Sequence, residues 1–170
     1  IVNSLMNWYL KRRIPAIEQM LNHPIQVQQD QLIKLLRTAQ TTEFGRKYEF
    51  KTIQNLETFK ERIPVTNYDD FKHYIERMMQ GEQNILWPSE VRWFAKSSGT
   101  TSAKSKFIPV TYESLEECHY QGGKDVLLHY MLNNPETEIF NGKGLVLGGS
   151  HQINQNNFES YFGDLSAVMM

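Results

Sequence analysis

The residues best suited to chemistry lie in one short stretch, Ser97-Ser98-Gly99-Thr100-Thr101-Ser102. Lysines flank it at Lys96, Lys104 and Lys106. Hydroxyl, ammonium and backbone N–H groups all donate to anions, and a glycine lets the backbone approach them closely. The stretch therefore predicts a loop that binds an anion, with phosphate as the natural ligand.

Composition alone does not establish this function, because runs of serine, threonine and glycine are more often solvated loops. The stretch also lacks the common nucleotide fingerprints. It contains neither G-x-x-x-x-G-K-[ST] nor G-x-G-x-x-G. The stretch is therefore not an ordinary P-loop.

Strands are predicted on both sides of this loop. Apolar residues alternate over Val91–Lys96, which is typical of a strand, and a second short strand follows over Phe107–Val110. The apolar run Gly144–Leu147 predicts a third, buried strand. Ligands of open α/β sheets lie beyond the carboxyl ends of strands. The residues that follow this third strand are therefore candidate substrate-binding residues, namely Gly149, Ser150 and His151.

Helical periodicity dominates the chain before these strands. It predicts a helical stretch over Asn3–Asn22 with a break at Pro15. Further helices are expected from Pro24 to a stop at Gly45, over Asn55–Arg62, and after the start signal at Thr66. The predicted fold class is α/β, with a helical segment packed on a sheet. Residues 1–82 are expected to be mainly helical, and residues 83–170 to be α/β and to carry the loop.

One more helix is predicted after the loop, from the N-cap residue Thr111 to about Asn133. Its interior contains Gly122-Gly123. Each glycine costs a helix about 1 kcal/mol relative to alanine, so the pair predicts that another element crosses this helix closely.

Composition narrows the functional classes. Of the 170 residues, 40% are apolar and 22% are charged, which is typical of a globular domain with a sizeable core. The net charge of −1 argues against nucleic-acid binding. No apolar run is long enough to span a membrane. The single cysteine, Cys118, fits a reducing compartment, so a cytoplasmic location is expected. We also expect a monomer.

Other kinds of site are not supported. Ser150 lacks the G-x-S-x-G context of a hydrolase nucleophile. The five histidines show no metal-ligand spacing with one another or with Cys118. His151 is by itself more typical of a surface loop than of a general base. Neither a hydrolase triad nor a protein-bound metal is predicted.

Three motifs in order resemble a known family. They are TEFGRKYEF (42–50), ETFKERIPVTNYDDFKHYIERMMQGE (57–82), and SSGTT followed by a lysine and FIPVT (97–111). Together they resemble the auxin-responsive acyl-acid-amido synthetases, a family within the adenylate-forming enzymes. The resemblance covers residues 42–110 well and residues 111–170 more loosely. Where the family usually has glycines and a proline in its loop, this chain has Ser102, Ala103 and Ser105.

This resemblance implies a fold and a reaction. The chain would be the N-terminal portion of one adenylate-forming domain, and the rest of that domain and a C-terminal domain would lie outside it. A carboxylic acid would react with ATP to give an acyl-adenylate, and the amine of an amino acid would then take the acyl group. Lys106 matches the family's loop lysine and would be the catalytic residue, with Lys104 as a helper. The stretch 97–102 would bind the ATP phosphates, and Mg²⁺ would bind together with ATP.

Two alternatives remain open from the sequence. Acyl- and aryl-CoA ligases carry a similar loop, so the acceptor could be a thiol rather than an amine. The chain could also be a nucleotide- or partner-binding domain without catalytic activity. The helical start and the FIPVT continuation (107–111) favour the amide-forming family.

Overall fold

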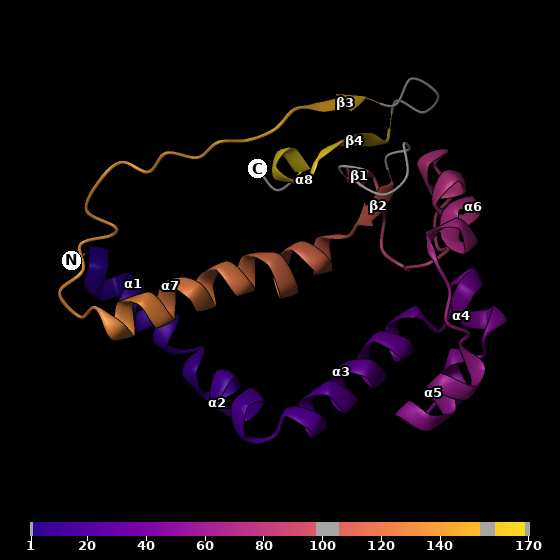
Figure 1. The fold of residues 1–170 in the computed structure, drawn as a ribbon, viewed down its shortest axis with the longest axis horizontal. Coiled ribbons are helices and arrows are strands. Elements are labelled where there is room, and N and C mark those ends of the chain that lie inside the picture. The colour runs from indigo at the N-terminus through magenta and orange to yellow at the C-terminus, as the bar shows by residue number, and fades with distance from the viewer. Residues whose placement is uncertain (1, 98–105, 154–158, 169–170) are drawn as a thin grey trace. The chain divides into compact units, whose positions relative to one another are not determined.

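The computed structural model describes residues 2–97, 106–153 and 159–168. The chain forms two units. The first consists of Ile1–Val27 and Glu113–Val146, and the second of Gln28–Tyr112 and Leu147–Met170. Figure 1 shows the helices and strands of both.

The first unit is helical. Its N-terminal part contains α1 (Val2–Lys11) and α2 (Ile14–Asn22), so the predicted break is confirmed. Pro15 lies in the first turn of α2, where a missing N–H is tolerated. Its C-terminal part begins with a π-helical segment, η2 (Ser114–Tyr120), which continues into α7 (Gln121–Asn133). The helical conformation starts directly after Thr111 and ends at Asn133, as predicted.

Helices α1, α2 and α7 enclose a core of their own. Leu10 of α1 and Ile17 of α2 are buried together with Leu128 and Met131 of α7. Beside this core, Arg13 Nε lies 3.0 Å from Asp125 Oδ1. The apolar residues of α1 and α2 thus share a core with those of α7.

The predicted close crossing at Gly122-Gly123 is wrong for the described residues of this unit. A Cβ atom added to either glycine would meet no atom within 4 Å. These glycines lie on an open side of α7, so close packing within the described residues does not explain them.

In the second unit, side-chain caps define where helices begin. After α3 (Pro24–Ala39), Thr42 caps α4 (Glu43–Lys47), and its Oγ1 accepts the Gly45 N–H at 2.9 Å. Asn55 caps α5 (Leu56–Arg62) in the same way. A short 3₁₀ helix, η1 (Phe50–Thr52), lies between them. Gly45 therefore lies inside α4 and does not end α3, which stops at Ala39.

Helix α6 (Tyr68–Met79) begins one residue later than the start signal suggests. Its N-cap is Asn67, which forms a reciprocal capping box with Asp70. Gly81 follows the helix with a φ of 99°, a value that glycine adopts without strain. The two ends of α6 are thus fixed by local sequence.

A mixed sheet of four strands completes the second unit. It contains β1 (Trp93–Lys96), β2 (Phe107–Val110), β3 (His151–Ile153) and β4 (Tyr161–Asp164), in the order β2-β1-β4-β3. The strand β1 pairs antiparallel with β2 and parallel with β4, and β3 pairs antiparallel with β4. A short helix, α8 (Leu165–Val168), follows β4. The predicted strands on both sides of the loop are confirmed.

The prediction of a third strand at residues 144–147 is wrong. Leu145, Val146 and Leu147 are 86%, 76% and 85% exposed and have no regular secondary structure. The strand begins later, at His151, and its partner β4 had not been predicted. Apolar character in a short run does not by itself require burial within the chain.

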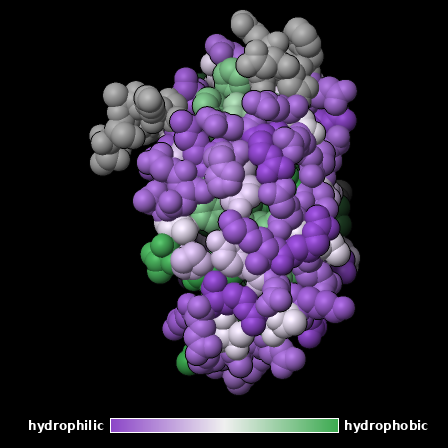
Figure 2. Space-filling view, turned by 90° about the vertical axis from the view of Figure 1, so that its right-hand side faces the viewer, coloured by the Kyte–Doolittle hydropathy of each residue, from purple (hydrophilic) through white to green (hydrophobic). Residues whose placement is uncertain are grey.

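Helix α6 covers one face of the sheet. Tyr74, Ile75 and Met78 of α6 are buried with Val91 and with Phe94 of β1, which is completely buried. Phe107 and Phe162 pack against the same core from β2 and β4. In Figure 2, which views the side where α4, α5 and α6 lie in Figure 1, the surface is mainly hydrophilic with a few small hydrophobic groups. The apolar side of α6 thus anchors the sheet, and the sheet in turn positions the two ends of the loop.

Candidate functional site

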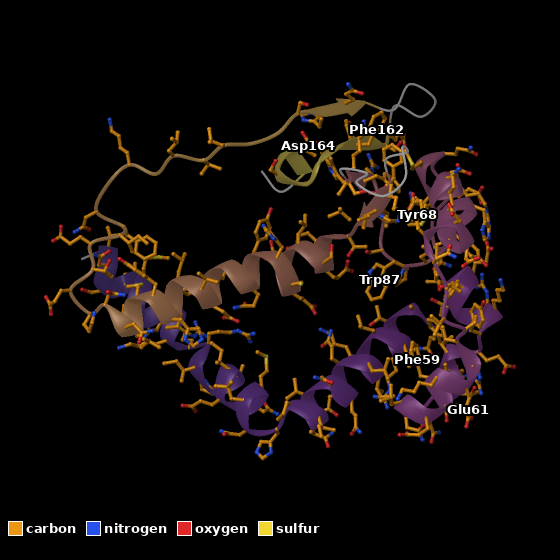
Figure 3. All side chains as sticks on the ribbon, in the orientation of Figure 1. Phe59, Glu61, Tyr68, Trp87, Phe162 and Asp164 are labelled. Carbon is orange, nitrogen blue, oxygen red and sulfur yellow. The ribbon has the colours of Figure 1, made fainter. Side chains whose placement is uncertain are left out.

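The candidate site lies at the carboxyl edge of the parallel pair β1 and β4. Their register places Lys96, the last residue of β1, opposite Asp164, the last residue of β4. Both residues are exposed. Figure 3 shows Asp164 at the end of β4, next to α8. Because the predicted anion-binding stretch starts directly after Lys96, it begins at the edge where ligands of α/β sheets bind.

The two ends of the predicted loop are joined to each other. The Ser97 N–H donates to the Lys106 carbonyl at 2.9 Å, and the Lys106 N–H donates to the Ser97 hydroxyl oxygen at 3.3 Å. Residues 98–105 connect these ends and lie outside the described residues, so the structure does not test Ser98, Gly99, Thr100, Thr101 and Ser102 as phosphate ligands. What it places are the two ends of the loop, at the carboxyl end of β1 and the start of β2.

Lys106 carries its charge beside an aromatic ring. Its Nζ lies 5.5 Å from the ring centroid of Tyr68, the first residue of α6, which is within the range of a cation–π interaction. Lys106 itself is exposed. None of the ion pairs found between described residues involves it. Its ammonium can therefore face an anionic ligand.

Gly149 and Ser150 lie at the same edge of the sheet as Asp164. The Gly149 N–H donates to the Ser166 hydroxyl at 2.9 Å, and the Asp164 N–H donates to the Ser150 carbonyl at 3.1 Å. A Cβ atom on Gly149 would come within 2.6 Å of the Asp164 Cβ. Glycine is thus required here by close approach of the chain to β4, which is a structural reason for this part of the motif.

His151 lies elsewhere. It belongs to β3, opposite Gly163, and its ring meets the Trp93 ring edge-on at 5.5 Å. Trp93 in turn stacks on Tyr161 at 4.6 Å. The side chain of His151 therefore joins an aromatic group on the sheet, whereas Gly149 and Ser150 precede the strand at its edge.

Sequence reasoning missed Tyr68 and Asp164 as residues of this site. Asp164 follows the aromatic pair Tyr161-Phe162 and Gly163, and aromatic residues are typical of strands, so this run could have identified a strand end. No local signal connects Tyr68 with Lys106, because the two residues meet only in the folded chain.

Other features of the described residues lie away from this edge. A surface pocket of about 240 Å³ lies between α4 and α6 and contains none of the predicted site residues. In it the Tyr74 hydroxyl is 2.9 Å from Lys47 Nζ, and this hydrogen bond raises the pKa of Lys47. No group of three or more His, Cys, Asp and Glu residues suited to a metal occurs within 2–97, 106–153 and 159–168. In the same ranges, no helix is long and apolar enough to cross a membrane.

The fold is similar to that of a solved acyl acid amido synthetase. The structure titled GH3.15 acyl acid amido synthetase superposes with a TM-score of 0.75 at 22% identity, over 91% of this chain and 28% of that one. A structure titled AtGH3.15 acyl acid amido synthetase in complex with 2,4-DB gives a TM-score of 0.64 at 25% identity, over 72% of this chain and 21% of that one.

The chain belongs to the GH3 family, because the GH3 family N-terminal domain matches residues 13–170. The resemblance read from the three sequence motifs is thus confirmed. An indole-3-acetic acid-amido synthetase from Arabidopsis thaliana, GH3.2, is 32% identical over 62% of this chain. A jasmonoyl–L-amino acid synthetase from Nicotiana attenuata, JAR6, is 28% identical over 78% of it. The matched regions span 19% and 22% of the length of these two relatives.

Proposed function

We propose that this chain is the phosphate-binding part of an ATP-dependent acyl acid amido synthetase. Such an enzyme adenylates a carboxylic acid and transfers the acyl group to the amine of an amino acid. The proposal rests above all on one observation: in a chain of the GH3 family, the ends of a hydroxyl-rich loop are joined at the carboxyl edge of the sheet. The names of the relatives, which are amido synthetases for indole-3-acetic acid and jasmonate, support the reaction class.

The residues at this edge fit a polyphosphate. Lys96 and Lys106 are exposed cations beside the loop. The Ser97 hydroxyl accepts a hydrogen bond from Lys106 N–H, so its own hydrogen can be donated to a phosphate oxygen. Asp164 adds a carboxylate to the same edge. A carboxylate repels phosphate unless a cation lies between them, and this combination suits phosphates that carry Mg²⁺.

The chain's own residues have positioning and electrostatic roles in this proposal. ATP would supply the adenylyl group that activates the acid. Lys106 would offset negative charge on the departing pyrophosphate, and the hydroxyls of residues 97–102 would orient the phosphates. Transfer of a phosphoryl-type group depends mainly on such alignment and charge neutralisation. Gly149 and Ser150 would line the same edge on the substrate side.

Exchange of labelled pyrophosphate into ATP tests the proposal. The intact protein should catalyse this exchange with at least one acid from a panel of carboxylates that includes indole-3-acetic acid, jasmonic acid and 2,4-DB. Reactions without acid are the control and should show no exchange. Absence of exchange with every acid, under conditions in which an active relative exchanges, contradicts the proposed adenylation.

A second assay separates an amine acceptor from a thiol acceptor. The acid that supports exchange is incubated with ATP and either a mixture of amino acids or coenzyme A, and the products are identified by mass spectrometry. We expect an amide with an amino acid. A thioester as the sole product would assign the protein to the acyl-CoA ligase reaction instead.

A further inference from the structure

Tyr68 makes an unusual set of contacts with the start of β2. Its phenolic oxygen accepts the Phe107 N–H at 2.9 Å and lies 3.2 Å from the Phe107 carbonyl, to which its O–H can donate. One side chain at the beginning of α6 therefore satisfies both backbone groups of the residue that follows Lys106. Figure 3 shows Tyr68 on α6, beside the sheet.

The position of β2 explains why Phe107 needs such a partner. The strand β2 is at the end of the order β2-β1-β4-β3, and Phe107 is paired with Lys96. The neighbouring pair, Ser97 and Lys106, is the hydrogen-bonded one. In an antiparallel ladder these pairs alternate, so the Phe107 N–H and carbonyl point away from β1. The Tyr68 hydroxyl takes the place that a further strand would have.

The ring of the same tyrosine faces the Lys106 ammonium. Lys106 Nζ lies 5.5 Å from the Tyr68 ring centroid, and the ring itself packs against the core between α6 and the sheet. Tyr68 thus fixes the backbone next to Lys106 through its hydroxyl and offers a negatively polarised surface to the side chain of Lys106 through its ring. A tyrosine that served packing alone would not need both contacts.

We propose that Tyr68 is a positioning residue that holds Lys106 at the exit of the phosphate-binding loop. This inference rests on the proposed function, because it assigns Tyr68 a role through Lys106. A flexible lysine loses conformational freedom when it binds a phosphate. A lysine whose backbone and ammonium are already restrained loses less of it, so Tyr68 should improve both ATP binding and pyrophosphate exchange.

The test compares two substitutions at position 68 in the intact protein, with ATP affinity measured by calorimetry and exchange measured with labelled pyrophosphate. Tyr68→Phe removes the hydroxyl and keeps the ring, so it should weaken ATP binding by about three- to tenfold, the range expected for one or two hydrogen bonds. Tyr68→Leu removes both contacts and should approach the loss seen in Lys106→Ala. The matched control is Tyr74→Phe. It removes a hydroxyl from the same helix, but this hydroxyl bonds Lys47 and not β2.

A double-mutant cycle separates positioning from simple support of the fold. If Tyr68 acts through Lys106, Tyr68→Leu should change ATP affinity less than about twofold when Lys106 is already alanine. An equal loss in both backgrounds overturns the inference and leaves Tyr68 as a brace between α6 and β2. A Tyr74→Phe variant as impaired as Tyr68→Phe would also overturn it.

The two proposals can fail separately. If the protein binds ATP but shows no exchange with any acid, the proposed adenylation is contradicted. The double-mutant cycle on ATP affinity still decides the role of Tyr68. A protein that binds no ATP contradicts both proposals.

Discussion

At the scale of single residues, Lys106 is the side chain on which the proposed chemistry depends most. Lys106→Ala should slow pyrophosphate exchange by about ten- to a hundredfold, since a hydrogen bond to a charged group contributes about 1.5–3 kcal/mol. Thermal stability should change little, because the residue is exposed. The matched control is Lys72→Ala on α6, where the lysine forms an exposed pair with Glu76 at 3.6 Å. Equal exchange rates in wild type and Lys106→Ala would remove Lys106 from the site.

Lys106 also shows what could be foreseen from residue types. Hydroxyls, a glycine and lysines in one stretch predict an anion site because their chemistry is local. The tyrosine that contacts Lys106 could not be foreseen, because Tyr68 reaches Phe107 only after α6 has packed on the sheet. Asp164 was missed for a similar reason, since its place beside Lys96 depends on the pairing of β1 with β4.

At the scale of elements, Arg77 joins α4, α6 and the segment after α6. Its Nη2 lies 2.8 Å from Glu43 Oε2 and 2.7 Å from Glu82 Oε2. The hydrogen bonds to Arg77 lower the pKa of both glutamates below the ordinary value of 4.5. A carboxylate with a lowered pKa in the folded state stabilises that state above its unfolded pKa, and this contribution is lost as the pH falls through its folded pKa.

Arg77→Met should therefore destabilise the protein at pH 7, and the difference from wild type should shrink as the pH falls below 4.5. Urea denaturation across this pH range measures the difference in unfolding free energy between the two proteins. The effect should be modest and smaller at high salt, because all three side chains are partly exposed. Lys72→Met, which removes the exposed pair with Glu76, is the control and should change stability less. A difference that stays constant from pH 7 to pH 3 would contradict this explanation.

The junction between α3 and α4 requires a glycine. A Cβ atom on the buried Gly45 would lie 2.0 Å from the Ala39 carbonyl oxygen, so Gly45→Ala must displace backbone. We expect Gly45→Ala to lower the free energy of unfolding by at least about 1–3 kcal/mol, as at other overpacked sites. Gly122→Ala is the matched comparison, because its Cβ would meet nothing within 4 Å in α7. Gly122→Ala should raise the free energy of unfolding by about 0.5–1 kcal/mol, because alanine lowers the conformational entropy of the unfolded chain. Equal unfolding free energies for the two variants would refute this contrast.

The helices could largely be predicted from the sequence. Of the sheet, only the strands β1 and β2 could be predicted. Pro15, Pro24 and Asn55 act within one turn of the helices that they start, so their signals can be read from neighbouring residues. Periodicity reports that a residue is apolar but not which surface covers it. For this reason the apolar run 145–147 wrongly predicts a buried strand. The cost of glycine in a helix likewise does not say whether another element covers Gly122-Gly123.

At the scale of the whole molecule, the chain alone should not perform the proposed reaction. It spans 28% of the solved synthetase that it resembles in fold, so most of the residues of such an enzyme have no counterpart in it. Residues 1–170 should therefore show no acid-dependent pyrophosphate exchange when the intact protein does, assayed at equal concentration. Exchange by residues 1–170 would place the whole adenylation site within this chain.

The parallel pairing of β1 with β4 has a consequence for synthesis on the ribosome. The strands β1 and β2 can form a hairpin as soon as Val110 has emerged, but β4 begins only at Tyr161. At about 5–20 residues per second, the nascent chain waits roughly 3–10 s for its partner strand. During that time one edge of β1 presents unpaired N–H and carbonyl groups, which can pair with another chain. Nascent chains stalled before Tyr161 should accordingly be bound by chaperones more than chains that extend past Asp164.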